Sequence, residues 1–309
     1  MRFFAATAFA ATLAFGTAAL ADPPNHAFRN GAAWSPSPEM HIKGDSVPVQ
    51  HVAEWDSKAR EGATVLISWD KDVAKAPKEA VKYEQKSFVF PTGTIRVLEF
   101  KKATGGVLHM ITMENEIFVL KGTVTVDVGG QNVTLNAGDA AYYPSGVMRG
   151  KGDATILAWN VTGTVPATQA KAQVVRAKDA STSQSAEWDG PDGKRVRANK
   201  PEELKKMPKN AIKLAVTRYT FDGNSVRVAK NFKGGPTSPA SGGLDALIYV
   251  TSGKLKFYQD GKEFDAVPGD AIREIAGARH YWNRLEDSSF VATSSLPVMG
   301  AKPGPATDR

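Results

Sequence analysis

The sequence predicts an all-β protein built from two copies of one barrel or sandwich. The first observation is the stretch from residue 122 to 149, GTVTVDVGGQNVTLNAGDAAYYPSGVMR, in which short turns separate three Val- and Thr-rich runs. Short β-runs punctuated by Gly, Asn and Pro at this spacing are typical of all-β sandwiches and barrels. The second observation is that the pattern returns 131 residues later, from residue 253 to 280, without a gap.

Matched positions in the two copies are mostly the turn residues. They are Gly122 and Gly253, Gly130 and Gly261, Gly138 and Gly269, Gly146 and Gly277, and Arg149 and His280. Two further matches lie upstream, AEWD at residues 53–56 and 186–189, and Arg-Val at residues 96–97 and 227–228. Self-similarity at a fixed period indicates duplicated architecture.

The repeat sets the expected domain boundaries. We predict a first barrel over residues 46–162 and a second over residues 183–296, with little helix. A linker over residues 163–182 joins them and contains a short strand near residues 173–176, and a loose tail covers residues 297–309. Pro and acidic residues at the start of residues 200–207 predict one short helix there.

The N-terminus has the pattern of a secretory signal peptide. Residues 1–21 combine an early Arg, an apolar run and a terminal Ala-Leu-Ala cleavage site. We therefore expect cleavage after Ala21 and a periplasmic or secreted protein. Residues 22–45, rich in Pro, Ser and Asn, are expected to form an extended N-terminal arm.

Composition limits the classes of function. The chain has 309 residues, 42% of them hydrophobic, no cysteine and a net charge of +7. Thiolate metal sites and cysteine nucleophiles are therefore excluded. The lysines are scattered over helical or loop-like segments, which argues against a nucleic-acid surface, and no later segment is apolar enough for a membrane span. A basic exported protein can attract anionic ligands such as sugar acids, polysaccharides or phosphorylated surfaces, but scattered, solvated lysines are the simpler interpretation of this charge.

The duplicated stretch resembles the cupin family. The spacing Gly138-x5-Pro144-x-Gly146-x2-Arg149 is similar to the second cupin motif, G-x5-P-x-G-x2-H, and residues 269–280 repeat it with His280 at the end. Residues 109–122 are similar to the first motif, which carries His and Glu. The resemblance implies two tandem double-stranded β-helix barrels, the cupin jelly-roll.

Cupins typically bind a divalent transition metal through three His and one Glu, and this sequence keeps only part of that set. In the first barrel the weak metal candidates are His109, Glu114 and Glu116, and Arg149 replaces the last ligand His. A guanidinium at that position attracts an anion rather than a metal. No cofactor is therefore predicted with a complete ligand set.

Metal-independent cupin enzymes imply a second set of roles. In the first barrel His109 and Glu116 are the candidate base and its orienter, and Tyr143 is a candidate acid. Arg149 and Arg96 are the candidate anion clamp. An outward-facing Arg96 and a Tyr143 that only packs in the barrel are the structural alternatives.

The second barrel offers a parallel set. His280 is its candidate catalytic residue, with Asp245 and Tyr249 beside it and Arg227 as the counterpart of Arg96. Only His280 survives there from the metal-ligand positions, and a lone inward His is more often a hydrogen-bonded core residue than a metal ligand.

Three functions stay open at this point. The leading hypothesis is an exported two-domain cupin that binds a small carboxylate or sugar acid in the first barrel and acts, if catalytic, as a metal-independent lyase or isomerase. The alternatives are a metal-dependent oxygenase or decarboxylase with an atypical site, and a non-catalytic binding or structural protein. A monomer and a homodimer are both compatible with the sequence.

Overall fold

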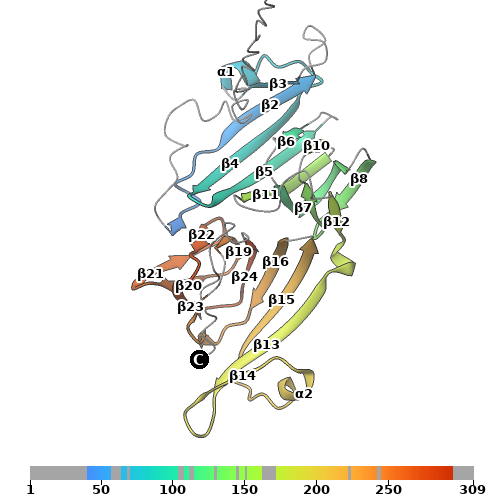
Figure 1. The fold of residues 1–309 in the computed structure, drawn as a ribbon. Coiled ribbons are helices and arrows are strands. Elements are labelled where there is room, and N and C mark those ends of the chain that lie inside the picture. Colours follow the sequence, from blue (N-terminus) through green and yellow to red (C-terminus); the bar gives the residue numbers. More distant parts are fainter. Residues whose placement is uncertain are drawn as a thin grey trace, which may run out of the picture.

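The computed structural model is all-β, as the sequence predicts (Figure 1). It describes residues 40–56, 64–67, 70–103, 108–110, 115–128, 131–143, 146–149, 152–161, 172–221, 224–241 and 245–294. Every strand pair in these ranges is antiparallel. Helix is limited there to α1 (Asp70–Val73), α2 (Pro201–Leu204) and one 3-10 turn (Ala177–Asp179). The predicted short helix near residue 200 is thus confirmed as α2.

The first barrel is formed by an eleven-stranded sheet. The order of its main path is β12-β9-β7-β11-β5-β4-β2-β3, and β6, β8 and β10 pair at its side. Its strands are β2 (Gln50–Asp56), β3 (Thr64–Ile67), β4 (Val81–Phe90), β5 (Gly93–Ala103), β6 (Leu108–Met110), β7 (Asn115–Val128), β8 (Gln131–Asn136), β9 (Ala140–Tyr143), β10 (Gly146–Arg149), β11 (Gly152–Val161) and β12 (Gln173–Val175).

The second barrel is formed by two sheets that face each other. The eight-stranded sheet has the order β1 (His41–Ile42), β22 (Ala271–Glu274), β19 (Ala246–Ser252), β24 (Ser288–Ser294), β16 (Asn224–Asn231), β15 (Ile212–Phe221), β13 (Ser181–Asp189), β14 (Arg195–Ala198). The five-stranded sheet contains β17 (Gly235–Pro236), β18 (Ala240–Ser241), β20 (Leu255–Gln259), β21 (Lys262–Ala266) and β23 (Arg279–Arg284). Apolar side chains of both sheets form the core between them.

Equivalent turns of the two copies have the same geometry. Gly122 and Gly253 both adopt positive φ, 75° and 68°. A Cβ on Gly122 would lie 1.8 Å from the carbonyl oxygen of Asp153, and one on Gly253 would lie 2.1 Å from that of Asp287. At both positions the backbone is left-handed and lies too close to another chain segment for a side chain to fit. Only glycine is therefore compatible with these turns.

Each barrel accepts a strand from the segment that precedes the other repeat. Strand β1, from the predicted N-terminal arm, pairs with β22 of the second barrel, and β12, from the predicted linker, pairs with β9 of the first. The short strand predicted near residue 173 is confirmed as β12. The predicted boundaries at residues 46 and 183 stay predictions, but β1 and β12, in the described parts of these two segments, pair within the sheets.

In each copy, one aspartate forms hydrogen bonds that hold the added strand, β1 or β12, against the barrel. Asp270 accepts hydrogen bonds from the Gly44 amide at 2.9 Å and lies 2.8 Å from the His41 ring. Asp139, 131 residues earlier, accepts from the Ala177 amide at 2.9 Å and pairs with the Arg176 guanidinium, also at 2.9 Å. The duplication therefore includes the buried carboxylate that holds the exchanged strand.

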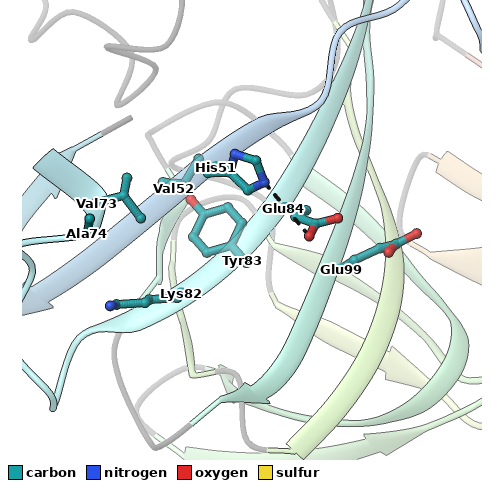
Figure 2. Close-up of a pocket in the computed structure, with 8 residues that line it drawn as sticks. All are labelled: His51, Val52, Val73, Ala74, Lys82, Tyr83, Glu84 and Glu99. Carbon is teal, nitrogen blue, oxygen red and sulfur yellow. Dashed lines mark ion pairs between the residues drawn. The ribbon is translucent and has the colours of Figure 1, made fainter. Parts of the chain in front are cut away.

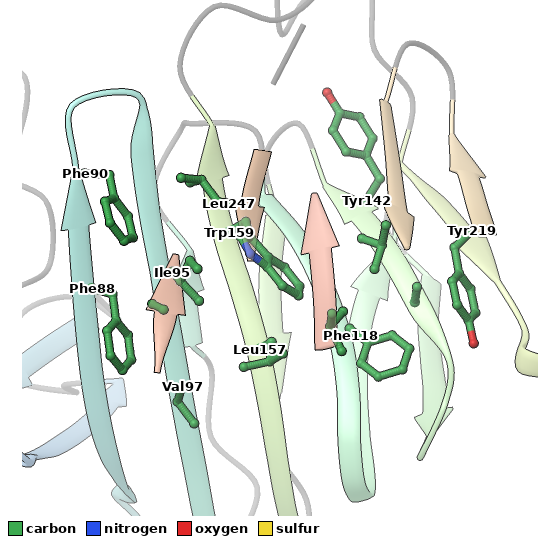
Figure 3. Close-up of a cluster of buried hydrophobic side chains, with 14 of the residues drawn as sticks. Phe88, Phe90, Ile95, Val97, Phe118, Tyr142, Leu157, Trp159, Tyr219 and Leu247 are labelled. Atoms are coloured by element: carbon green, nitrogen blue, oxygen red, sulfur yellow. The ribbon is translucent and has the colours of Figure 1, made fainter. Parts of the chain in front are cut away.

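A hydrophobic cluster joins the two barrels (Figure 3). The Phe118 and Tyr219 rings meet edge to face at 5.5 Å between centroids, and Tyr142 stacks on Phe221 at 5.9 Å. Strands of the first barrel thus bury both faces, one toward their own interior and one toward the second barrel. We call this set the interface cluster; its largest members are Phe88, Phe90, Ile95, Phe118, Tyr142, Leu157, Trp159, Tyr219, Phe221 and Leu247.

Candidate functional site

A cavity of about 270 Å³ lies inside the second barrel. Strand alternation builds its walls, because residues two apart on one strand face the same side. On β16 the lining residues are Arg227, Ala229 and Asn231, and on β23 they are His280, Trp282 and Arg284. Glu274 of β22 adds the one carboxylate of the described lining; Leu214, Val216, Ala240, Ile248 and Phe290 complete it.

His280 and Glu274 form the central polar pair of this cavity. The His280 Nε2 lies 3.3 Å from the Glu274 Oε1, and His280 Nδ1 lies 3.3 Å from the carbonyl oxygen of Ala278. The Trp282 indole N–H donates to the same Glu274 oxygen at 3.2 Å. Both ring nitrogens of His280 therefore face acceptors, and a neutral imidazole has a proton for only one of them. The pair is thus suited to exchange a proton with a bound molecule.

Two arginines, the buried Arg284 and the partly buried Arg227, make the cavity cationic. Burial lowers the pKa of Arg227, against the attraction of Glu274 and, more weakly, of Glu116, whereas the neighbouring Arg218 lowers it further. Burial also lowers the pKa of Arg284 to about 10, against the attraction of Glu187. With a pKa of about 10, Arg284 stays charged at neutral pH, and a guanidinium is in general a fixed cation in proteins. One carboxylate, Glu274, faces two cations in this cavity, so an anion would be stabilised there.

Asp245 and Tyr249 lie away from His280. Asp245 is bound by the Arg273 guanidinium at 2.7 Å and by the Ala276 amide at 2.7 Å. Tyr249 projects toward the first barrel, where its ring meets Phe88 at 5.9 Å, and burial raises its pKa. The structure therefore does not bring these two candidates into the cavity of the second barrel.

Arg96 and Glu116 lie on opposite faces of the sheet in the first barrel. Arg96 is 7% exposed and alternates on β5 with Ile95 and Val97, both members of the interface cluster, so it faces the barrel interior. Glu116 is 1% exposed and pairs across the strands with Trp159. Because Trp159 belongs to the interface cluster, Glu116 faces the second barrel rather than the interior of its own barrel.

The remaining candidates are described only by their backbone or not at all. His109 on β6 pairs with Val147, and Arg149 on β10 pairs with Thr125. His280 pairs instead with Gln259, the counterpart of residue 128, so the two copies differ in register at this strand. The side chains of His109, Tyr143 and Arg149, and all of Glu114, lie outside the described residues. Their roles stay predictions.

A second depression of about 420 Å³ lies on the outside of the first barrel (Figure 2). His51 and Glu84 face each other there at 3.9 Å, and Glu99 follows Glu84 in the next strand. The His51 side chain is 50% exposed and that of Glu84 is 31% exposed. This larger hollow is therefore a solvated surface groove, in contrast to the buried polar cavity of the second barrel.

Comparison with known proteins supports the cupin fold. Residues 96–150, which begin within β5 and end just after β10, match the cupin domain family. A comparison with curated proteins finds no match.

Several solved cupin-like structures share the fold. Oxalate decarboxylase from Bacillus subtilis, described with Mn(II) centres, is 13% identical, with a TM-score of 0.51, over 85% of this chain and 78% of its own. HEPD from Streptomyces albus, with 2-hydroxyethylphosphonate and Fe(II) bound, is 11% identical, with a TM-score of 0.52, over 74% and 77%. AerE from Microcystis aeruginosa is 12% identical, with a TM-score of 0.50, over 69% and 92%. At such identity these likenesses show the fold alone.

The cavity of the second barrel does not fit the metal that cupin folds commonly hold. Among the described residues no group of three His, Asp or Glu side chains is placed to bind a metal ion. Ala240 occupies one of the usual ligand positions, Leu247 at another belongs to the interface cluster, and Arg227 and Arg284 line the cavity. A divalent cation would meet two like charges there. For the first barrel, the metal candidates stay predictions because their side chains are not described.

Three polar residues of the cavity were not anticipated from the sequence: Asn231, Glu274 and Arg284. Counting by twos along the strands would have found two of them, because Arg284 is four residues after His280 and Asn231 is four after Arg227. Glu274 carries no such signal. It comes from a neighbouring strand, and only the pairing of the sheets places it beside His280.

No described helix is long and apolar enough to cross a bilayer.

Proposed function

We propose that this cupin binds a small organic anion in the cavity of its second barrel. One observation carries the proposal: the buried Arg284 and the partly buried Arg227 line a cavity whose described lining contains a single carboxylate, Glu274. Burial of a charge is costly unless an opposite charge compensates it. A carboxylate or phosphate ligand supplies that compensation. A volume of about 270 Å³ suits a molecule of metabolite size.

The His280–Glu274 pair extends the proposal from binding to chemistry. A bound acid with a hydroxyl or an acidic C–H next to this pair can lose a proton to it and regain one at another atom. Such transfers are the core of lyase and isomerase reactions. We therefore propose metal-independent acid–base chemistry, with His280 as the group that moves the proton and Glu274 as its charge partner.

This proposal places the site in the other barrel from the one the sequence favoured. In the first barrel Glu116 faces the interface cluster, whereas Arg96 faces the barrel interior. The two side chains therefore lie on opposite faces of the sheet and do not form one site. In the second barrel, by contrast, the structure describes the polar side chains that line one cavity together. The support for it is therefore stronger, and the first-barrel roles of His109 and Arg149 stay as a testable alternative.

A ligand screen tests the proposal. Isothermal titration of the mature protein with small carboxylates, sugar acids and phosphate should find at least one that binds. At least one of Arg227→Met and Arg284→Met should then weaken binding about tenfold to a hundredfold, because it removes charged hydrogen bonds. Arg195→Met, an exposed arginine on β14, is the matched control and should bind normally.

Two outcomes contradict the proposal. Unchanged affinity in both folded variants, Arg227→Met and Arg284→Met, would place the ligand elsewhere. A loss of binding in Arg149→Met alone would return the site to the first barrel.

Export is a separate proposal that rests on the signal pattern of residues 1–21. The mass of the mature protein recovered from the periplasm, with residue 22 at its start, would support it.

A further inference from the structure

The cavity of the second barrel has two chemically different ends. Arg227 and Asn231 are four residues apart on β16, and His280 and Arg284 are four apart on β23. Four residues of a strand span roughly 13 Å, so the members of each pair lie toward opposite ends.

Contacts show which residues share an end. Glu274 touches His280 at 3.3 Å and attracts Arg227, so these three form what we call the histidine end. Arg284 donates to the carbonyl oxygen of Lys213 at 2.9 Å, and the next residue, Leu214, pairs with Asn231. Arg284 and Asn231 therefore form the other end, which we call the arginine end.

The two ends differ in charge. At the histidine end the Glu274 carboxylate already opposes the charge of Arg227. At the arginine end the described lining includes no carboxylate. Glu187 acts on Arg284 from a distance, and it is engaged by Arg197 at 2.8 Å and by the Ser238 amide at 2.8 Å. The uncompensated positive charge of the cavity thus lies at the arginine end.

Two buried donors at the arginine end have no acceptor in the described structure. They are the Arg284 Nε–H and an N–H of the Asn231 side-chain amide. Arg284 is 5% exposed and Asn231 is 4% exposed. A buried donor without a partner costs about 1–3 kcal/mol, and an oxoanion with several lone pairs can accept from both.

We infer that the ligand is a short hydroxy or oxo acid whose oxoanion binds at the arginine end and whose hydroxyl or carbonyl reaches the histidine end. The inference rests on the proposed function and adds substrate class and orientation. Glu274 would repel an anion placed beside it, whereas a hydroxyl can donate to it. Trp282, Ile248 and Phe290 form the apolar wall between the two ends, where the carbon chain lies.

Selectivity measurements test this orientation. The probes are straight-chain hydroxy acids of two to six carbons, the same acids without the hydroxyl, and the corresponding hydroxy amides. The wild-type protein should prefer one hydroxy acid over its neutral amide by at least about tenfold. Arg284→Gln should reduce that preference to about threefold or less, and Glu274→Gln should reduce the preference for the hydroxyl over hydrogen.

Asn231→Ala removes the second donor with little change of charge. It takes the place of Arg284→Gln in the test if that variant does not fold. Arg195→Met is the matched control and should keep both preferences. If Arg284→Gln and Asn231→Ala keep the acid preference while Arg227→Gln loses it, an anion binds in the opposite orientation and the inference is overturned, although the proposed function stands. If the wild-type protein binds none of the acids or other anions, the proposed function fails and the inference fails with it.

Discussion

At the scale of single residues, charge and burial indicate which of the candidate side chains can contribute to a functional site. His280 was predictable from the cupin-like spacing, and Arg227 from its match to Arg96. Glu116 matches a ligand position in the motif, yet it faces the interface cluster. The sequence could not show this, because both faces of β7 are buried and alternation alone does not say which face belongs to which barrel.

The buried aspartates make a residue-scale prediction about acid stability. Burial works to raise the pKa of Asp270, but hydrogen bonds from His41, Gly44 and Val267 outweigh it and lower the pKa below 3.8. The unfolded state then binds more protons in acid, so this stabilisation is present above about pH 4 and is lost as the pH falls through the lower folded value.

Asp270→Asn should therefore lower the free energy of unfolding at pH 7 by about 2–3 kcal/mol, since it removes charged hydrogen bonds. It should also flatten the decline of stability between pH 5 and pH 3, as measured by urea unfolding. Asp265→Asn is the control, because Asp265 lies on the surface in ion pairs with Lys254 and Lys256. An equal effect of the two substitutions would refute the anchoring role of Asp270.

At the scale of elements, turn chemistry was the most predictable property of this chain. The Gly-, Asn- and Pro-punctuated runs become β7 to β10 and, 131 residues later, β19 to β23. Exchange of β1 and β12 was not predictable, because it depends on contacts such as that between His41 and Asp270, which are 229 residues apart. Local patterns carry no information on such pairings.

At the same scale, two glycines in different surroundings test the close approach of chain segments at a turn. Gly253 and Gly261 both have positive φ, but a Cβ on Gly253 meets the Asp287 carbonyl at 2.1 Å, whereas one on Gly261 meets nothing within 4 Å. Gly261→Ala should cost about 1–2 kcal/mol of strain. Gly253→Ala should cost clearly more, since the backbone itself must shift. Thermal unfolding compares them, and similar losses would contradict the close approach.

At the scale of the whole molecule, the interface cluster makes the two barrels depend on each other. Edge-to-face contact of Phe118 with Tyr219 predicts a coupling free energy of about 1 kcal/mol in a double-mutant cycle with Phe118→Ala and Tyr219→Ala. The pairing of Phe118→Ala with Phe257→Leu, in the separate core of the second barrel, should be additive. Zero coupling for the first pair, or two separate unfolding transitions, would show that the barrels fold independently.

Tryptophan NMR shows whether the ligand binds in the second barrel. Trp282 lines the cavity, whereas Trp159 is fully buried in the interface cluster. In a protein with ¹⁵N-labelled tryptophan, assigned with Trp282→Phe, the best-binding acid should shift the Trp282 indole resonance saturably and leave that of Trp159 unchanged. Saturable binding with an unmoved Trp282 resonance would contradict the account.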